Sequence, residues 1–187
     1  MKDLYAAMAP LFDYPGPDYL DNIARCLTFS SGEIQSQLRA FRRQIEEIGI
    51  ACLQEIYIET FDFHAESAAY IGYHLFGEDI RRSLFMAELR GRYRECGLLE
   101  NSELPDHFAN VLRFLGASDA GEERSELIHT CLIPALRHVL RAMKPNNPYT
   151  PLLQAILLTS QRESTSIVPA GKIAWTPFSS SSCPTSR

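Results

Sequence analysis

The stretch Glu103-Leu-Pro-Asp-His-Phe-Ala-Asn-Val-Leu-Arg-Phe-Leu115 joins an acidic turn to an amphipathic helix. The apolar residues of its helical part recur at i, i+3, i+4 and i+7, which predicts one buried stripe; they are Phe108, Val111, Leu112 and Leu115. Pro105 fixes its own φ and suits the first turn of a helix. Glu103 and Asp106 therefore precede a helix N-terminus, where the helix dipole favours negative charge. We call Glu103, Pro105, Asp106 and His107 the acidic corner, which is either a helix start or a docking site.

The same helical spacing recurs on both sides of this stretch, and no strand pattern competes with it. Ser and Thr caps, Pro at first turns and Gly at ends set the expected boundaries. The expected helices cover residues 4–11, 17–27, 31–48, 51–61, 66–76, 79–96, 108–115, 127–143 and 151–158. The sequence therefore predicts an all-α, single-domain bundle of about eight amphipathic helices.

Four local features carry more specific expectations. Gly72 lies inside an expected helix, which indicates that another helix or a ligand passes close to it. Pro134 either kinks its helix or makes it begin anew near Ile133. Thr150 is the expected N-cap of the last helix. The small and charged residues 116–124 are expected to form a flexible loop.

Length and charge narrow the class of protein. A chain of 187 residues predicts one domain, here residues 1–158, followed by a Ser- and Pro-rich tail at 159–187 that Trp175 and Phe178 could tie down. A net charge of −5 argues against nucleic-acid binding. We expect a cytoplasmic protein without membrane insertion, because no apolar run approaches about 20 residues and the N-terminus lacks a signal-peptide core. The five scattered cysteines fit a reducing compartment.

The sequence shows no arrangement of residues that is typical of catalysis or metal binding. The five histidines form no metal motif, and no nucleophile elbow, P-loop or dinucleotide fingerprint occurs. Asp106 and His107 are not expected to act as an acid–base pair, because adjacent helical residues do not face each other. We therefore expect no enzyme activity and no cofactor. The pairs Arg42-Arg43 and Arg81-Arg82 are expected on solvated helix faces.

An unusual density of aromatic residues precedes the acidic corner in the chain. We call the stretch from Tyr57 to Tyr73 the aromatic segment; its rings are Tyr57, Phe61, Phe63, Tyr70 and Tyr73. These rings either pack in the core or line a groove for an apolar peptide, in which case Glu59, Asp62 and Glu66 would attract a basic partner. A regulatory all-α ligand-binding or DNA-binding module is the alternative from another class, although no basic recognition helix supports DNA binding.

Several motifs in this order resemble the NarJ family of nitrate reductase assembly chaperones, also described as the nitrate reductase delta subunit. They are Tyr57-Ile-Glu-Thr-Phe61-Asp62-Phe63, Tyr70-Ile-Gly-Tyr73-His74-Leu-Phe-Gly77, Arg81-Arg82, Tyr93-x-x-x-Gly97, Glu103-Leu-Pro105-Asp106-His107 with Leu112-Arg-Phe114-Leu115, and Asn147-Pro148-Tyr149. The resemblance covers about residues 4–158. The chain departs from the family pattern at Ser83, Ala109 and Arg113.

The resemblance implies an all-α cytoplasmic chaperone, a monomer or weak dimer, that is absent from the mature enzyme. Such proteins bind the N-terminal segment of an apo molybdoenzyme catalytic subunit, often a twin-arginine signal or its remnant, while the molybdenum cofactor is inserted. Respiratory nitrate reductase is the expected client; a dimethyl sulfoxide or trimethylamine N-oxide reductase is the alternative. The expected peptide-binding residues are Tyr57, Phe61, Asp62, Tyr70, Tyr73, Glu103, Pro105, Asp106 and His107.

Overall fold

The computed structural model describes residues 1–99 and 102–166. Within these residues every secondary-structure element is a helix, apart from one isolated β-bridge, which confirms the all-α class. The α-helices are α1 (Lys2–Met8), α2 (Tyr19–Thr28), α3 (Gly32–Ile48), α4 (Ile50–Tyr57), α5 (Ile71–Phe76), α6 (Ile80–Glu95), α7 (Phe108–Ala117), α8 (Glu122–Glu126), α9 (Ile133–Ala142) and α10 (Thr150–Ser166). The short 3-10 or π segments are η1 (Ala9–Phe12), η2 (Ile58–Asp62), η3 (Ala65–Ser67) and η4 (Leu127–Leu132).

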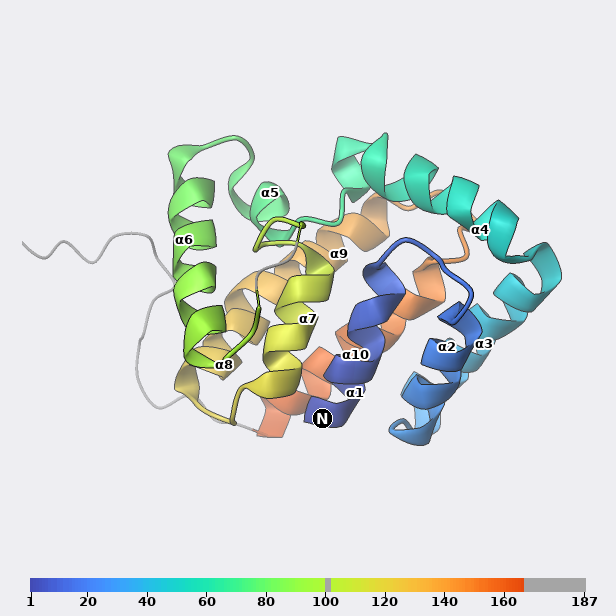
Figure 1. Cartoon of the computed structure of the whole chain (residues 1–187), viewed down its shortest axis with the longest axis horizontal. Helices are drawn as coiled ribbons and strands as arrows, with labels where there is room; N and C mark the ends of the chain where they lie inside the picture. Colours follow the sequence, from blue (N-terminus) through green and yellow to red (C-terminus); the bar gives the residue numbers. More distant parts are fainter. Residues whose placement is uncertain (100–101, 167–187) are drawn as a thin grey trace, which may run out of the picture.

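The helices form one bundle in which segments far apart in sequence lie side by side (Figure 1). Helix α10 packs along α3, and α1 packs along α7. The predicted stripe of α7 is fully buried in this arrangement. A Cβ added to Gly116 would lie 2.8 Å from the Cβ of Ala6, so the α1 and α7 backbones approach too closely for a larger residue. The α7 helix that follows the acidic corner is therefore central to the core.

Part of the aromatic segment belongs to this core. The ring centroid of Phe61 lies 5.8 Å from that of Phe12 and 4.9 Å from that of Tyr149. The hydroxyl group of Tyr57 donates a hydrogen bond of 2.8 Å to the carbonyl oxygen of Phe12. Such tilted and edge-on ring pairs stabilise a core beyond their buried area. Core packing, the first of the two interpretations, therefore holds for Tyr57 and Phe61.

The expected helix over residues 66–76 is wrong in its first half. The chain forms the 3-10 turn η3, then extends at Tyr70, and only Ile71–Phe76 is α-helical. Because the backbone is extended at Tyr70, the peptide groups on either side of this residue can bond to a distant segment. The helical period of the sequence contains no sign of such a segment. Helices α5 and α6 still form the expected short hairpin, because Gly77 at φ 62° ends α5 and Asp79 caps α6.

Proline and asparagine set two further boundaries. Helix α9 begins at Ile133 with Pro134 in its first turn, and Leu132 before it also has helical backbone, so the chain stays helical from η4 into α9. The preceding π segment η4 supplies a wider turn just before the proline, whose missing N–H interrupts regular bonding. At the start of α10, Asn147 provides the side-chain cap, since its Oδ1 accepts the Tyr149 N–H at 2.9 Å. The expected cap, Thr150, is instead the first residue of the helix.

The loop expected to be flexible is held at its end by a buried ion pair. Arg124 is 3% exposed, and its Nε lies 2.5 Å from Oε1 of Glu163 on α10. Its Nη1 donates to the carbonyl oxygen of Leu115. Helix α10 continues to Ser166, so the expected domain boundary at residue 158 falls inside a helix. Trp175 and Phe178 lie outside the described residues.

Candidate functional site

The acidic corner and the aromatic segment are joined by their backbones. Tyr70 and His107 form an isolated antiparallel β-bridge. The Ile71 N–H donates to the Asp106 carbonyl oxygen at 2.8 Å, and the Phe108 N–H donates to the Ala69 carbonyl oxygen at 2.9 Å. These bonds place the start of α5 beside the start of α7, two segments that the sequence analysis assigned to one surface.

The side chains at this junction add further contacts. The Tyr70 hydroxyl donates to Oε2 of Glu103 at 3.0 Å, and the Tyr70 ring stands edge-on to His107 with centroids 5.3 Å apart. The Tyr93 hydroxyl of α6 donates to the Pro105 carbonyl oxygen at 2.7 Å. The corner is therefore fixed from α5, from α6 and from its own helix.

Asp106 is the buried centre of the site. Its side chain is 0% exposed and pairs with Arg82 of α6, whose side chain is 18% exposed. The Arg82 Nε lies 2.8 Å from Oδ2, and Nη2 lies 3.5 Å from Oδ1. The Arg82 guanidinium also lies 5.5 Å from the ring centroid of Tyr70 and 5.7 Å from that of Tyr73, within cation–π range. The expectation of a solvated face is therefore wrong for Arg82.

Gly72 explains how α5 approaches this ion pair. A Cβ at Gly72 would lie 2.7 Å from Oδ2 of Asp106 and 3.1 Å from both Cγ of Arg82 and Cδ1 of Phe85. The expected close approach is confirmed, and the neighbours are the side chains of the ion pair. A residue with a side chain at this position would push Asp106 and Arg82 apart.

His107 has a structural role in the same corner. It is 3% exposed, and its Nδ1 accepts the Ala109 N–H at 3.3 Å, so it caps the N-terminus of α7. Burial lowers the pKa of His107, although the nearby carboxylates of Glu103 and Asp13 oppose that shift. A neutral imidazole suits the cap, because the capping nitrogen needs a free lone pair.

The electrostatic environment of the site is acidic. Burial, the hydrogen bond to Glu103 and the charges of Glu103, Asp106 and Asp62 together raise the pKa of Tyr70 to about 12. Burial likewise raises the pKa of Tyr57, with Asp62 and Glu103 as the next causes. The charges of Asp62 and Glu103 thus act on both tyrosine hydroxyls.

The expected site residues thus divide by exposure. The buried group supports the surface from below and comprises Tyr57, Phe61, Pro105, Asp106 and His107. The solvent-facing group comprises Asp62 and Glu103, which are exposed, and Tyr70 and Tyr73, which are half-buried. Only the second group can touch a partner without rearrangement.

The structure adds residues that sequence reasoning did not assign to the site. Tyr14 is exposed and stands edge-on to Tyr57 at 5.8 Å, and Phe63 is 75% exposed beside Asp62. Arg113 pairs with Asp13 and bonds to Asn110, so it neutralises part of the acidic charge. Arg82 could have been suspected from its place in the resemblance, but no local pattern identified its partner.

A small pocket adjoins the exposed edge of the acidic corner. It has a volume of about 60 Å³, and its walls include Tyr93, Leu98, Glu103, Pro105 and Arg113. Ligand sites for drug-sized molecules enclose roughly 300–1,000 Å³. The volume of this pocket lies well below that range.

Two further features are absent from the described residues. No group of three or more His, Cys, Asp or Glu side chains in residues 1–99 and 102–166 is arranged to hold a metal ion. No helix in that part of the chain has the length and apolar character needed to cross a bilayer.

Comparison with protein families matches residues 28–152 to the nitrate reductase delta subunit. The chain belongs to this family. The matched range runs from the end of α2 into α10 and includes the whole junction of acidic corner and aromatic segment. The family expected from the motifs is thus confirmed.

A curated relative extends the match. The chain is 24% identical over 159 residues to a probable nitrate reductase molybdenum cofactor assembly chaperone, NarJ, of Bacillus subtilis (strain 168). The aligned region covers 82% of this chain and 85% of that protein. The similarity therefore extends over most of both chains.

Proposed function

We propose that this delta-subunit family member is a non-enzymatic assembly chaperone for a nitrate reductase. In this proposal it binds the N-terminal segment of the apo catalytic subunit in the cytoplasm, as a monomer or weak dimer, and assists insertion of the molybdenum cofactor. Family membership and the name of the Bacillus subtilis relative support the assembly role. The bound segment would be a twin-arginine signal or its remnant.

The observation that carries the peptide-binding part is that the exposed carboxylate of Glu103 bonds to the half-buried Tyr70 at the junction, where the charge of exposed Asp62 also acts on the Tyr70 hydroxyl. Asp62 and Glu103 offer negative charge, while Tyr14, Phe63 and Tyr73 offer aromatic surface. A peptide with basic residues followed by apolar residues matches both features. The buried group beneath, with Asp106 and His107 at its centre, holds this surface in shape.

Charged and apolar contacts would contribute differently to binding. Complementary charge accelerates encounter and makes it salt-dependent, whereas apolar burial supplies most of the affinity. The pocket beside Glu103 would accept one client side chain against Leu98 and Pro105. The peptide would therefore contact the loop before α7, the start of α5 and the end of η2.

The test is calorimetric titration with a synthetic peptide of the first residues of the nitrate reductase catalytic subunit from the same organism. We expect Asp62→Asn combined with Glu103→Gln to weaken binding about tenfold at low salt, since two exposed charge pairs of about 0.7 kcal/mol each add up to about 1.4 kcal/mol. Glu47→Gln is the matched control, because Glu47 is an exposed carboxylate on α3 outside the site. Equal affinities of the double variant and the control would contradict the site.

The identity of the client is tested by a panel. N-terminal peptides of nitrate, dimethyl sulfoxide and trimethylamine N-oxide reductases are titrated under the same conditions, and we expect the nitrate reductase peptide to bind at least tenfold more tightly, a difference of about 1.4 kcal/mol. Preference for another peptide would keep the chaperone role and reassign its client.

A further inference from the structure

Arg82 occupies the place where a basic client peptide would be expected to place its own charge. The carboxylate of Asp106 and the rings of Tyr70 and Tyr73 surround its guanidinium. These three residues were expected to bind the client, yet a side chain of the chain itself fills the space between them. The feature is therefore either a structural ion pair or a binding site that is already occupied.

We propose that Arg82 is an internal substitute for a client arginine, which displaces it from Asp106 and from the tyrosine rings when the client binds. This inference rests on the proposed function and extends it to the way in which the site is kept closed before binding. We call the set of Asp106, Tyr70 and Tyr73 the guanidinium site.

The chemistry of the site favours a guanidinium over other cations. A guanidinium is planar, can offer two donors to one carboxylate, and stacks on aromatic faces. Both features occur here, as two nitrogens of Arg82 face the two oxygens of Asp106 at 2.8 and 3.5 Å, and two rings lie within 6 Å of its central carbon. None of these contacts involves the backbone of Arg82, so another guanidinium could make all of them.

The position of Arg82 makes an exchange possible. Asp106 is fully buried, whereas Arg82 reaches it from the solvent-facing side of α6 and remains partly exposed. Neighbouring Arg81 and Ser83 are both exposed. Withdrawal of the Arg82 side chain into solvent would open the path to Asp106 that it now fills.

The exchange would also conserve charge. A buried carboxylate that loses its partner is strongly destabilised, whereas replacing one guanidinium by another leaves Asp106 paired both before and after the exchange. A client that lacks an arginine could not offer this compensation. The occupied site would thus select for arginine in the client and disfavour non-specific apolar peptides.

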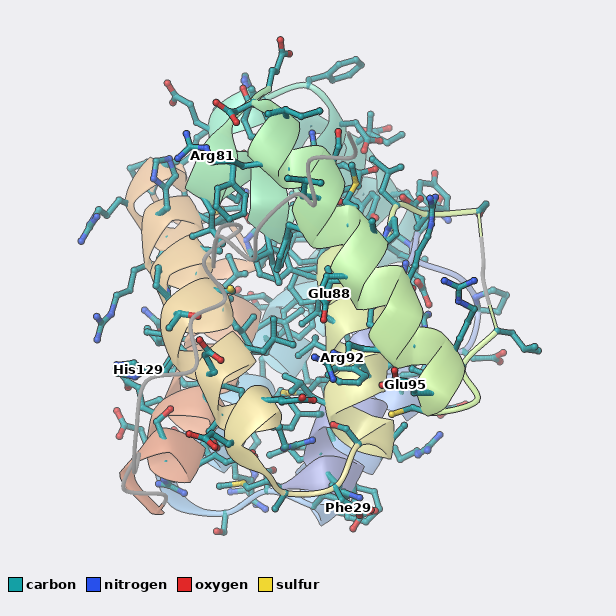
Figure 2. The ribbon with its side chains drawn as sticks, turned by 90° about the vertical axis from the view of Figure 1, so that its left-hand side faces the viewer. Phe29, Arg81, Glu88, Arg92, Glu95 and His129 are labelled. Carbon is teal, nitrogen blue, oxygen red and sulfur yellow. The ribbon has the colours of Figure 1, made fainter. Side chains whose placement is uncertain are left out.

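Helix α6 carries a second arginine beside the first. Arg81 lies near the N-terminal end of α6 (Figure 2), pairs with Asp79 at 3.0 Å and stands 5.9 Å from the ring centroid of Phe76. Two consecutive arginines of the chain therefore both contact a carboxylate and an aromatic ring. Arg81 is exposed, so Arg81→Ala is the control for removing a guanidinium without opening the site.

The first experiment is chemical rescue of Arg82→Ala by methylguanidinium, followed by thermal unfolding. Arg82→Ala should lower the melting temperature. We expect tens of millimolar methylguanidinium to reverse about half of that decrease, because a ligand that binds only the folded state stabilises it. Methylammonium should have a smaller effect, and wild type, Arg81→Ala and the double variant Arg82→Ala/Asp106→Asn should not respond. Equal responses of all variants, or none in Arg82→Ala, would overturn the guanidinium site.

The second experiment titrates wild type and Arg82→Ala with two peptides, the nitrate reductase N-terminal peptide and the same peptide with its arginines replaced by glutamine. Removing the internal competitor should raise affinity for the arginine peptide about tenfold and leave the glutamine peptide unchanged. An equal loss for both peptides would identify Arg82 as a structural residue only. If Arg82→Ala does not fold, Arg82→Gln retains part of the side-chain volume and gives the same comparison.

The two experiments separate the two proposals. Peptide binding by wild type without any methylguanidinium effect overturns the role of Arg82 and leaves the chaperone function in place. Methylguanidinium rescue without peptide binding by either protein overturns the proposed function, and the exchange with it.

Discussion

Replacing Gly72 by alanine tests whether α5 must lie against the Arg82–Asp106 ion pair. In most helices Gly→Ala stabilises by about 1 kcal/mol, because alanine has the higher helix propensity. Here the added Cβ would lie 2.7 Å from Oδ2 of Asp106, with Arg82 and Phe85 at 3.1 Å on other sides. Overpacking of this kind costs about 1–3 kcal/mol. The strain should exceed the propensity gain, since the nearest atom is held by its ion pair and cannot swing away.

Gly91 is the matched control, because it lies in α6 and an added Cβ there would meet nothing within 4 Å. We expect Gly91→Ala to raise the free energy of unfolding by about 0.5–1 kcal/mol and Gly72→Ala to lower it by about 1–2 kcal/mol. For a chain of this size the melting temperatures would then differ by roughly 3–12 °C. Urea denaturation and thermal scans measure both quantities. Equal stability of the two variants would refute the close approach of α5 to the ion pair.

Three further predictions concern stability. The folded-state pKa of His107 lies below its ordinary value, so stability should fall as pH drops below about 6.5. Urea titrations should show a weaker fall for His107→Asn, which keeps the cap, and half-buried His74, whose pKa is also lowered, should account for part of the remaining fall. Glu163→Gln should cost about 3–5 kcal/mol in denaturant unfolding, because Arg124 would stay buried without its charged partner. Tyr93→Phe removes one hydrogen bond to the acidic corner and should cost about 1 kcal/mol, or about 2–4 °C in a thermal scan.

The helices themselves could be read from the sequence. Their buried stripes follow a regular period, and Gly49, Gly77 and Gly97 end helices at positive φ as expected. The errors fall where distant contacts override local pattern. Tyr70 is extended because the residues on either side of it bond to the acidic corner. Arg124 is buried because Glu163 neutralises its charge. Local periodicity contains no information about such partners.

The candidate site was predictable in its location but not in its burial. The aromatic segment and the acidic corner lie together, as we expected when we assigned residues of both to one peptide-binding site. The sequence could not show that Asp106 and His107 face inward, because a short polar turn is usually solvated. The missing information was the partner of Asp106, since a carboxylate is rarely buried without a cation. Arg82 supplies that cation from a helix whose charges looked like an ordinary solvated face.

The β-bridge between Tyr70 and His107 has a consequence for how the bundle can open. It closes a loop that contains the whole α5–α6 hairpin, and both of its hydrogen bonds come from backbone atoms. Side-chain changes within the hairpin can alter what the surface binds while this closure keeps its two ends together. The hairpin is thus held at its two ends by backbone bonds and along α6 by the side chains of Arg82 and Tyr93, so exposing the carboxylate of Asp106 requires the release of more than one of these contacts.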